Sequence, residues 1–191
     1  MNIFNNPDFF PTPTHIIDRM LIGVEVADKI ILEPSAGNGN ILDHLNGFGA
    51  NTLSCEKIDD LARICATKSK FLKNDFLKLE AHEVSHIDYI IANPPFSNAD
   101  EHILHAWNIA PEGCHIIALC NYETIGNSYS RRRSELKKII LDYGSSENLG
   151  NVYVVGNASD QNNAIGEIYF NSNPSVVIAP NTYGRLFITS Y

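Results

Sequence analysis

Two glycines and a carboxylate gather where the first apolar run of the chain ends. The run Lys29–Glu33 is followed by the turn Pro34–Gly39, and a helix is expected directly after it. Glycine lets the backbone approach a ligand closely, and a helix start offers unpaired N–H groups. Glu33 at the strand end disfavours a phosphate nearby and suits a ligand with a positive group. The turn lacks the GxGxxG spacing of dinucleotide-binding loops, so taken alone it is also compatible with an ordinary strand-to-helix connection.

A second carboxylate, Glu56, closes the second strand candidate, Asn51–Cys55. Folds that alternate strands and helices carry a ribose-binding carboxylate roughly 20 residues after the glycine turn. Glu56 stands at that place, so the sequence predicts that it binds ribose hydroxyl groups.

The tetrapeptide Asn93–Phe96 (NPPF) follows a buried apolar run without a spacer. Pro94 and Pro95 fix the backbone and remove two N–H donors, which leaves their carbonyl groups as acceptors. The Asn93 amide and a fixed carbonyl could hold both hydrogens of an amino group, and Phe96 could stack on the ring that carries it. This set favours a planar, amino-bearing substrate such as adenine. The alternative is a purely structural Pro-Pro loop.

Apolar runs alternate with helical patterns along the chain. We expect strands at Lys29–Glu33, Asn51–Cys55, Ser69–Leu72, Ile87–Ala92, Cys114–Cys120, Asn151–Val155 and Ala164–Phe170. We expect helices at Asn40–Asn46, Asp59–Thr67, Asp100–Ala110 and Arg132–Tyr143. A short helix to about Leu21 should precede them, with Thr12 as its N-cap and Pro13 as its first residue.

Unbroken apolar strands separated by helices indicate a parallel sheet with helices on both faces. The last two strands are close in sequence and should pair as a hairpin. The sequence therefore predicts an α/β fold with a mostly parallel, seven-stranded sheet that contains one antiparallel strand.

Composition limits the class of protein. The chain has 191 residues, 44% of them hydrophobic and 19% charged, which suits one globular domain and excludes a disordered chain. Its net charge of −8 has the wrong sign for a protein whose whole surface grips nucleic acid. On charge alone we would expect a small-molecule substrate. With neither a secretory signal nor an apolar run long enough to cross a membrane, we expect a cytoplasmic protein with free cysteines.

A further pattern suggests a different class of protein, a metalloprotease. His82–His86 matches HExxH, the zinc motif of metalloproteases, but a strand is expected directly after His86, whereas the motif requires a long helix. We expect no metal site, and we expect His102 and His105 to be solvated positions on a helix.

The one basic cluster, Arg131–Lys138, holds five of the chain's 14 Lys and Arg residues. It follows a strand whose end should face the substrate cleft, so it predicts contact with nucleic-acid phosphates, although most charge runs are simply solvated. Tyr122 and Tyr129 lie in the same connection and could stack on bases. The predicted contact residues are Tyr122, Tyr129, Arg131, Arg132, Arg133 and Lys137.

The order and spacing of these pieces resemble the class I S-adenosylmethionine-dependent methyltransferases over about residues 9–170. NPPF resembles the signature of their amino-methyltransferase branch, most typically the N6-adenine methyltransferases. The resemblance implies that the cofactor, S-adenosylmethionine, is bound by motifs in four places: an N-terminal Phe-x-Thr-Pro motif, the glycine turn, the carboxylate after the second strand and an Asp-Phe pair. The residues implied to bind it are Phe10, Thr12, Pro13, Glu33, Pro34, Ala36, Gly37, Asn38, Gly39, Glu56, Asp75, Phe76 and Asn93.

The resemblance also implies a reaction. The Asn93 side-chain oxygen and the Pro94 carbonyl would accept the hydrogens of a flipped-out adenine amino group, and Phe96 would stack on the base. Catalysis would then rest on positioning and on stabilising the charge that grows on nitrogen. DNA adenine is the expected acceptor, and RNA adenine shares the tetrapeptide. Protein glutamine is the third candidate, although that branch more often has Tyr in place of Phe96, and a non-catalytic binding subunit is the fourth.

Domain organisation follows from the motif spacing. We expect one catalytic domain over residues 1–170 and a short extension, 171–191, with a hairpin around Pro180–Gly184. The short interval between Asp75 and Asn93 leaves no room for the target-recognition domain that sequence-specific adenine methyltransferases carry. Target reading is therefore expected to be minimal, based on shape, or supplied by a separate specificity subunit.

Overall fold

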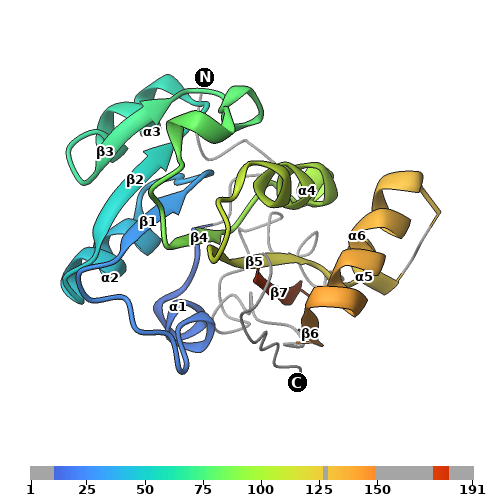
Figure 1. Ribbon diagram of the computed structural model, residues 1–191. Helices are drawn as coiled ribbons and strands as arrows, with labels where there is room; N and C mark the ends of the chain where they lie inside the picture. Colours follow the sequence, from blue (N-terminus) through green and yellow to red (C-terminus); the bar gives the residue numbers. More distant parts are fainter. Residues whose placement is uncertain (1–10, 127–128, 149–173, 181–191) are drawn as a thin grey trace, which may run out of the picture.

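The computed structural model describes residues 11–126, 129–148 and 174–180. Five parallel strands form the centre of the sheet in the order β3-β2-β1-β4-β5 (Figure 1). They span β1 Ile30–Glu33, β2 Asn51–Cys55, β3 Lys70–Lys73, β4 Tyr89–Ala92 and β5 His115–Asn121. The chain therefore has a Rossmann-like fold with a parallel sheet, as the alternation of apolar runs and helical patterns predicts.

Two more strands continue the sheet beyond β5. These are β7 Pro174–Pro180, which pairs antiparallel with β5, and β6 Ser145–Asn148, which pairs antiparallel with β7. Neither is one of the two strands predicted for this end of the chain, Asn151–Val155 and Ala164–Phe170, which lie outside the described residues. β7 falls in the segment that sequence analysis sets apart as an extension. The predicted strand count and hairpin thus stay predictions.

Successive residues of the central strands face opposite layers of core. Leu32, Ile90 and Ile116 pack with Leu79, Ala106 and Ile109 on one face. Their neighbours Ile31, Ile91 and Ile117 pack with Ile16, Ile17, Met20, Ile41 and Leu45 on the other. Because side chains alternate along a strand, an unbroken apolar run means burial on both faces. This packing fixes the strands whose carboxyl ends carry the motifs.

Helices cover the sheet on both faces. They are α1 Thr14–Met20, α2 Asn40–Gly47, α3 Asp59–Cys65, α4 Ala99–Ile109, α5 Tyr122–Gly126 and α6 Arg131–Tyr143. Short 3₁₀ turns lie at η2 Phe76–Lys78, η3 Ala81–Glu83 and η4 Phe96–Asn98. None of the helices described here is both long and apolar enough to cross a bilayer.

The start of α1 differs from the prediction. Pro13 is the N-cap, with an extended ψ of 146°, and Thr14 is the first helical residue. Thr12 is therefore not the N-cap; it lies one position further out and is 4% exposed. Its hydroxyl group instead accepts a hydrogen bond from Asn93.

All four cysteines are free and buried, as predicted. Burial raises the pKa of each thiol to about 12, so none is a thiolate at neutral pH. These are Cys55, Cys65, Cys114 and Cys120.

Candidate active site

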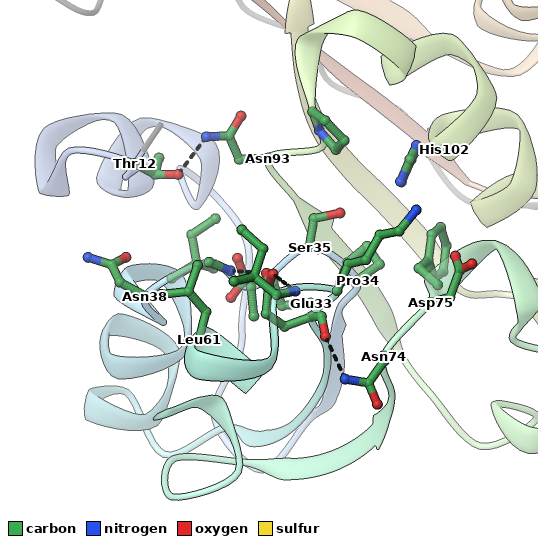
Figure 2. A pocket seen from close by; sticks show the side chains of 18 of the residues that line it. Thr12, Glu33, Pro34, Ser35, Asn38, Leu61, Asn74, Asp75, Asn93 and His102 are labelled. Carbon is green, nitrogen blue, oxygen red and sulfur yellow. Dashed lines mark hydrogen bonds between the residues drawn. The ribbon is translucent and has the colours of Figure 1, made fainter. Parts of the chain in front are cut away.

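A cavity of about 290 Å³ opens at the carboxyl ends of β1, β2 and β4. Its wall combines the predicted glycine turn, both carboxylates, the Asp-Phe pair and the NPPF loop (Figure 2). The residues of the cofactor prediction that line it are Thr12, Glu33, Pro34, Ala36, Gly37, Asn38, Glu56, Asp75, Phe76 and Asn93. Ligands of open α/β sheets bind at this edge.

Some predicted residues lie elsewhere. Pro13 and Gly39 are not part of the cavity wall, and of the NPPF loop only Asn93 and Pro95 are. Phe10 lies outside the described residues.

The glycine turn adopts backbone angles that favour glycine. Gly37 has φ 55° and Gly39 has φ 81°, and Gly39 is the N-cap of α2. A Cβ on Gly39 would stand 2.8 Å from Cδ of Lys68, so the lysine side chain would have to shift, and the positive φ disfavours a side chain there in any case. The Nζ of Lys68 donates to the Asn38 carbonyl at 2.9 Å and pairs with the carboxylate of Asp43 at 2.6 Å. Lys68 thus holds the outer side of the turn.

Glu33 is 2% exposed, and its Oε2 has no hydrogen-bond partner among the described residues. Burial, and then the nearby carboxylate of Glu56, raise its pKa well above the ordinary value. In Figure 2 Glu33 lies at the centre of the residues drawn, beside Pro34. A buried carboxylate with an unpaired oxygen at a cavity wall is suited to a cationic group, which would pair with it and lower its pKa again.

Glu56 is held by the backbone at both oxygens. Oε2 accepts from the N–H of Gly37 and Oε1 from the N–H of Ile58, each at 2.8 Å. Burial raises its pKa, and these backbone hydrogen bonds work against that rise. The carboxylate is thus oriented at the cavity wall and still has lone pairs to accept hydroxyl groups.

Phe76 lines the cavity but is largely covered by neighbouring side chains. It is 3% exposed and packs against His102 (ring centroids 5.9 Å, stacked) and His105 (4.9 Å, edge-on). Asp75 caps the turn η2 by accepting from the Leu77 N–H at 3.2 Å. Most of the Phe76 surface is therefore covered by protein, and the two rings of α4 share the wall behind Asp75.

The prediction that His102 and His105 are solvated is wrong. His102 lines the cavity, and its Nδ1 lies 3.1 Å from the Asn98 carbonyl, while Nε2 of His105 lies 3.1 Å from the Leu79 carbonyl. A carbonyl only accepts, so Nδ1 of His102 carries the hydrogen. Burial lowers the pKa of His102, so its ring is neutral near pH 7 and Nε2 is an acceptor.

The NPPF loop turns directly from β4 into η4. Pro94 is buried, and the Pro95 carbonyl accepts from the Asn98 N–H at 3.1 Å. The Pro95 carbonyl therefore already has one partner within the loop. The Nδ2 of Asn93 donates to Oγ1 of Thr12 at 3.0 Å (Figure 2).

Sequence reasoning missed several wall residues. The cavity is also lined by Pro11, Ser35, Asn40, Ile41, Lys57, Ile58, Leu61, Asn74, Leu77, Asn98 and His102. Most of these residues are adjacent in sequence to the motifs, so the positions of the motifs could have predicted them. His102 is different, because only the packing of α4 beside the NPPF loop brings it to the cavity.

The basic cluster begins α6, whose N-cap Ser130 accepts from the Arg133 N–H. Arg132 pairs with Glu101 at 2.9 Å and approaches Asp100 at 3.7 Å, both in the first turn of α4. The positive charge of Arg132 is thus partly neutralised by these two carboxylates. Arg131 is exposed, Lys137 is half-buried and Tyr129 is 92% exposed. The side chain of Tyr122 lies outside what the structure describes.

The HExxH segment does not form a helix. His82 and Glu83 end the 3₁₀ turn Ala81–Glu83, and Val84 leaves it in a non-helical conformation. Glu83 pairs with Lys73 at 2.8 Å, and His82 lies 3.2 Å from Glu80. The zinc-peptidase alternative therefore lacks the helical face that would bring its two histidines together.

Comparisons with known proteins confirm the resemblance to methyltransferases. The chain is 35% identical over 91 residues to the type II methyltransferase M.HincII of Haemophilus influenzae, a match that covers 46% of this chain and 16% of that relative. The chain thus spans about a sixth of the length of the curated relatives that it matches. No family model matches the sequence.

Solved structures share the fold at low identity. A modification subunit of a putative type I restriction enzyme from Vibrio vulnificus has a TM-score of 0.68 at 12% identity, covering 95% of this chain and 46% of that one. An RNA methyltransferase from Salinibacter ruber, solved with S-adenosyl-L-homocysteine, has a TM-score of 0.55 at 13% identity, covering 92% and 97%. The fold is therefore the Rossmann-like methyltransferase fold.

Proposed function

We propose that this chain transfers a methyl group from S-adenosylmethionine to the N6 amino group of adenine in DNA. The observation that carries the proposal is that Asn93, Glu33, Glu56 and Asp75 line one cavity. The unpaired buried oxygen of Glu33 fits a cationic cofactor. When bound, the cofactor would supply an electrophilic methyl group on a sulfonium centre, and its transfer to the acceptor nitrogen would release S-adenosylhomocysteine and one amino proton.

Residues of the chain bind and orient the cofactor. Glu33 faces the positively charged amino-acid part of the cofactor, Glu56 accepts the ribose hydroxyl groups and Asp75 accepts from the adenine amino group. The glycine turn brings its backbone N–H groups close to the cofactor.

On the acceptor side, the Asn93 oxygen and the Pro94 carbonyl each accept one hydrogen bond from the amino group and orient the nitrogen lone pair. Phe96 stacks on the target ring. No residue needs to form a covalent bond, so positioning and electrostatics supply the catalysis.

DNA is favoured as the acceptor by the type II methyltransferase and the restriction-enzyme modification subunit among the similar proteins. In the proposal α6 contacts phosphates through Arg131, Arg133 and Lys137, with Tyr122 and Tyr129 near the target strand. A specificity subunit is a candidate partner. The proposal also includes a cytoplasmic location, one catalytic domain over residues 1–170 and the seven-stranded sheet with one antiparallel strand.

The test is transfer of a tritiated methyl group, with duplex DNA, single-stranded DNA, ribosomal RNA and a protein extract offered side by side. We expect label at N6 of DNA adenine. Asn93→Ala should abolish this turnover and change cofactor affinity little, whereas Asn108→Ala, at an exposed position of α4, should change neither. Label in RNA alone or in protein alone would replace DNA as the acceptor, and a protein that binds no cofactor would refute the proposal.

A further inference from the structure

We propose that Thr12 is a positioning residue, which holds the Asn93 amide with its oxygen turned toward the methyl acceptor. This inference rests on the proposed function, because it concerns the same site. It differs from what the sequence resemblance implies for the N-terminal motif, which is contact with the methionine part of the cofactor.

An asparagine amide has two chemically opposite ends. The nitrogen end carries two donors and the oxygen end only accepts. A target amino group also presents donors, so only the oxygen end of Asn93 can receive it. An amide flipped by 180° would point its NH₂ group at the donors of the target amino group. Because the NH₂ group and the oxygen are almost the same size, packing alone would not prevent this flip. Catalysis through Asn93 therefore requires a contact at the nitrogen end that holds the amide in the unflipped orientation.

Thr12 provides this contact: a threonine hydroxyl can donate or accept, and here it accepts from the nitrogen end. The Nδ2 of Asn93 donates to Oγ1 of Thr12 at 3.0 Å, although 81 positions separate the two residues. Thr12 is 4% exposed, so water has little access to take its place. With the nitrogen end engaged by Thr12, the oxygen end is turned away from α1. Figure 2 shows this orientation, with the Asn93 nitrogen on the Thr12 side and its oxygen pointing away.

The backbone of Thr12 is itself held in place. The Asn40 Nδ2 donates to the Thr12 carbonyl at 3.1 Å, and Asn40 is the first residue of α2, directly after the glycine turn. Pro13 fixes the backbone on the other side with φ −65°. The helix α1 that follows is anchored by Ile16, Ile17 and Met20, which are buried against the sheet. Thr12 therefore joins the glycine turn to the NPPF loop through two hydrogen bonds.

The experiment compares Thr12→Val, which has the same shape and cannot accept a hydrogen bond, with Thr12→Ser, which can. Thr14→Val, an exposed threonine two residues away, is the matched control. Three quantities are measured: kcat with the acceptor identified above, the affinity for S-adenosyl-L-homocysteine by calorimetry, and the Asn93 side-chain amide signals in protein labelled with ¹⁵N-asparagine. Loss of Asn93 signals in Asn93→Ala provides their assignment.

We expect Thr12→Val to lower kcat by about 10- to 100-fold, with KM and cofactor affinity changed less than about threefold. The Asn93 amide signals should shift and exchange with solvent faster. Thr12→Ser should restore both, and Thr14→Val should match the parent protein. If Thr12→Val does not fold, Thr12→Ala removes the same acceptor without adding a methyl group at the hydroxyl position.

Two results would overturn the inference: unchanged Asn93 signals in Thr12→Val, or a loss of cofactor affinity as large as the loss of rate, which would make Thr12 a cofactor contact. If the parent protein methylates none of the acceptors, the proposed function fails instead. The amide signals still decide whether Thr12 orients Asn93.

Discussion

The backbone N–H of Gly37 donates to Oε2 of Glu56 at 2.8 Å, across 19 positions of sequence. This hydrogen bond ties the glycine turn after β1 to the end of β2. The other carboxylate oxygen accepts from Ile58, so one side chain fixes two loops of the cavity wall. Glu56 is therefore both a candidate ribose acceptor and the group that holds the turn in shape.

We expect Glu56→Gln to weaken both properties. The amide keeps one accepting oxygen but sets an NH₂ group against a backbone N–H, so one hydrogen bond is lost and a buried donor is left unpaired. The free energy of unfolding should fall by about 1–3 kcal/mol, by chemical denaturation. Cofactor affinity should fall at least 10-fold by calorimetry. Asp60→Asn, on the exposed side of α3, should change neither quantity by a comparable amount.

Glu33 should make the free protein less stable as the pH rises. Burial and the Glu56 carboxylate raise its pKa in the fold, so the folded state binds the proton more tightly than the unfolded chain does. This contribution is fully present below the ordinary pKa and is lost as the pH rises through the raised value.

Glu33→Gln removes that dependence. Without cofactor, its midpoint of thermal unfolding at pH 7.5 should exceed that of the parent protein by roughly 2–4 °C. The difference should shrink toward pH 5, and cofactor affinity should be lost. Glu25→Gln, an exposed carboxylate before β1, is the control. Lower stability of Glu33→Gln at every pH would show that the charge of Glu33 is already compensated.

Gly39 should tolerate no side chain. Gly39→Ala places a Cβ at φ 81° and 2.8 Å from Lys68, which we expect to lower the free energy of unfolding by about 1–2 kcal/mol. Gly39→Ala combined with Lys68→Ala relieves the contact and leaves the backbone strain, so it separates the two causes. Gly47→Ala, where nothing lies within 4 Å, should be neutral or stabilising. Equal effects of Gly39→Ala and Gly47→Ala would contradict this account.

Arg131 and Arg132, which begin α6, should contribute differently to DNA binding. Arg131→Gln should reduce the salt dependence of DNA binding, measured as the slope of log K against log salt, by about one contact. Arg132→Gln should change the slope less, because Arg132 pairs with Glu101, and should cost at most about 1 kcal/mol of stability. Arg63→Gln on α3 is the control. Equal slopes for Arg131→Gln and the parent protein would mean that the cluster is only solvated.

The local patterns of the sequence were sufficient to predict the central sheet and the main motifs. Short apolar runs bounded by turn residues favour strands buried on both faces, which is why β1, β4 and β5 lie close to their predicted ranges. Residues next to a strand end, such as Glu33, Glu56 and Asn93, then meet at one edge, because parallel strands all end there. For these residues position in the sequence determines position in the site.

The other contacts of the candidate site depend on tertiary packing alone. His102 reaches the cavity because α4 packs beside η2, and Phe76 is covered by that helix; helical spacing could not distinguish this from a solvated face. The contact between Thr12 and Asn93 joins segments 81 positions apart, and nothing in either segment specifies the other. The sequence by itself determined which residues stand at strand ends, because that is set by local periodicity. The partners of their side chains depended on how the helices close over the sheet.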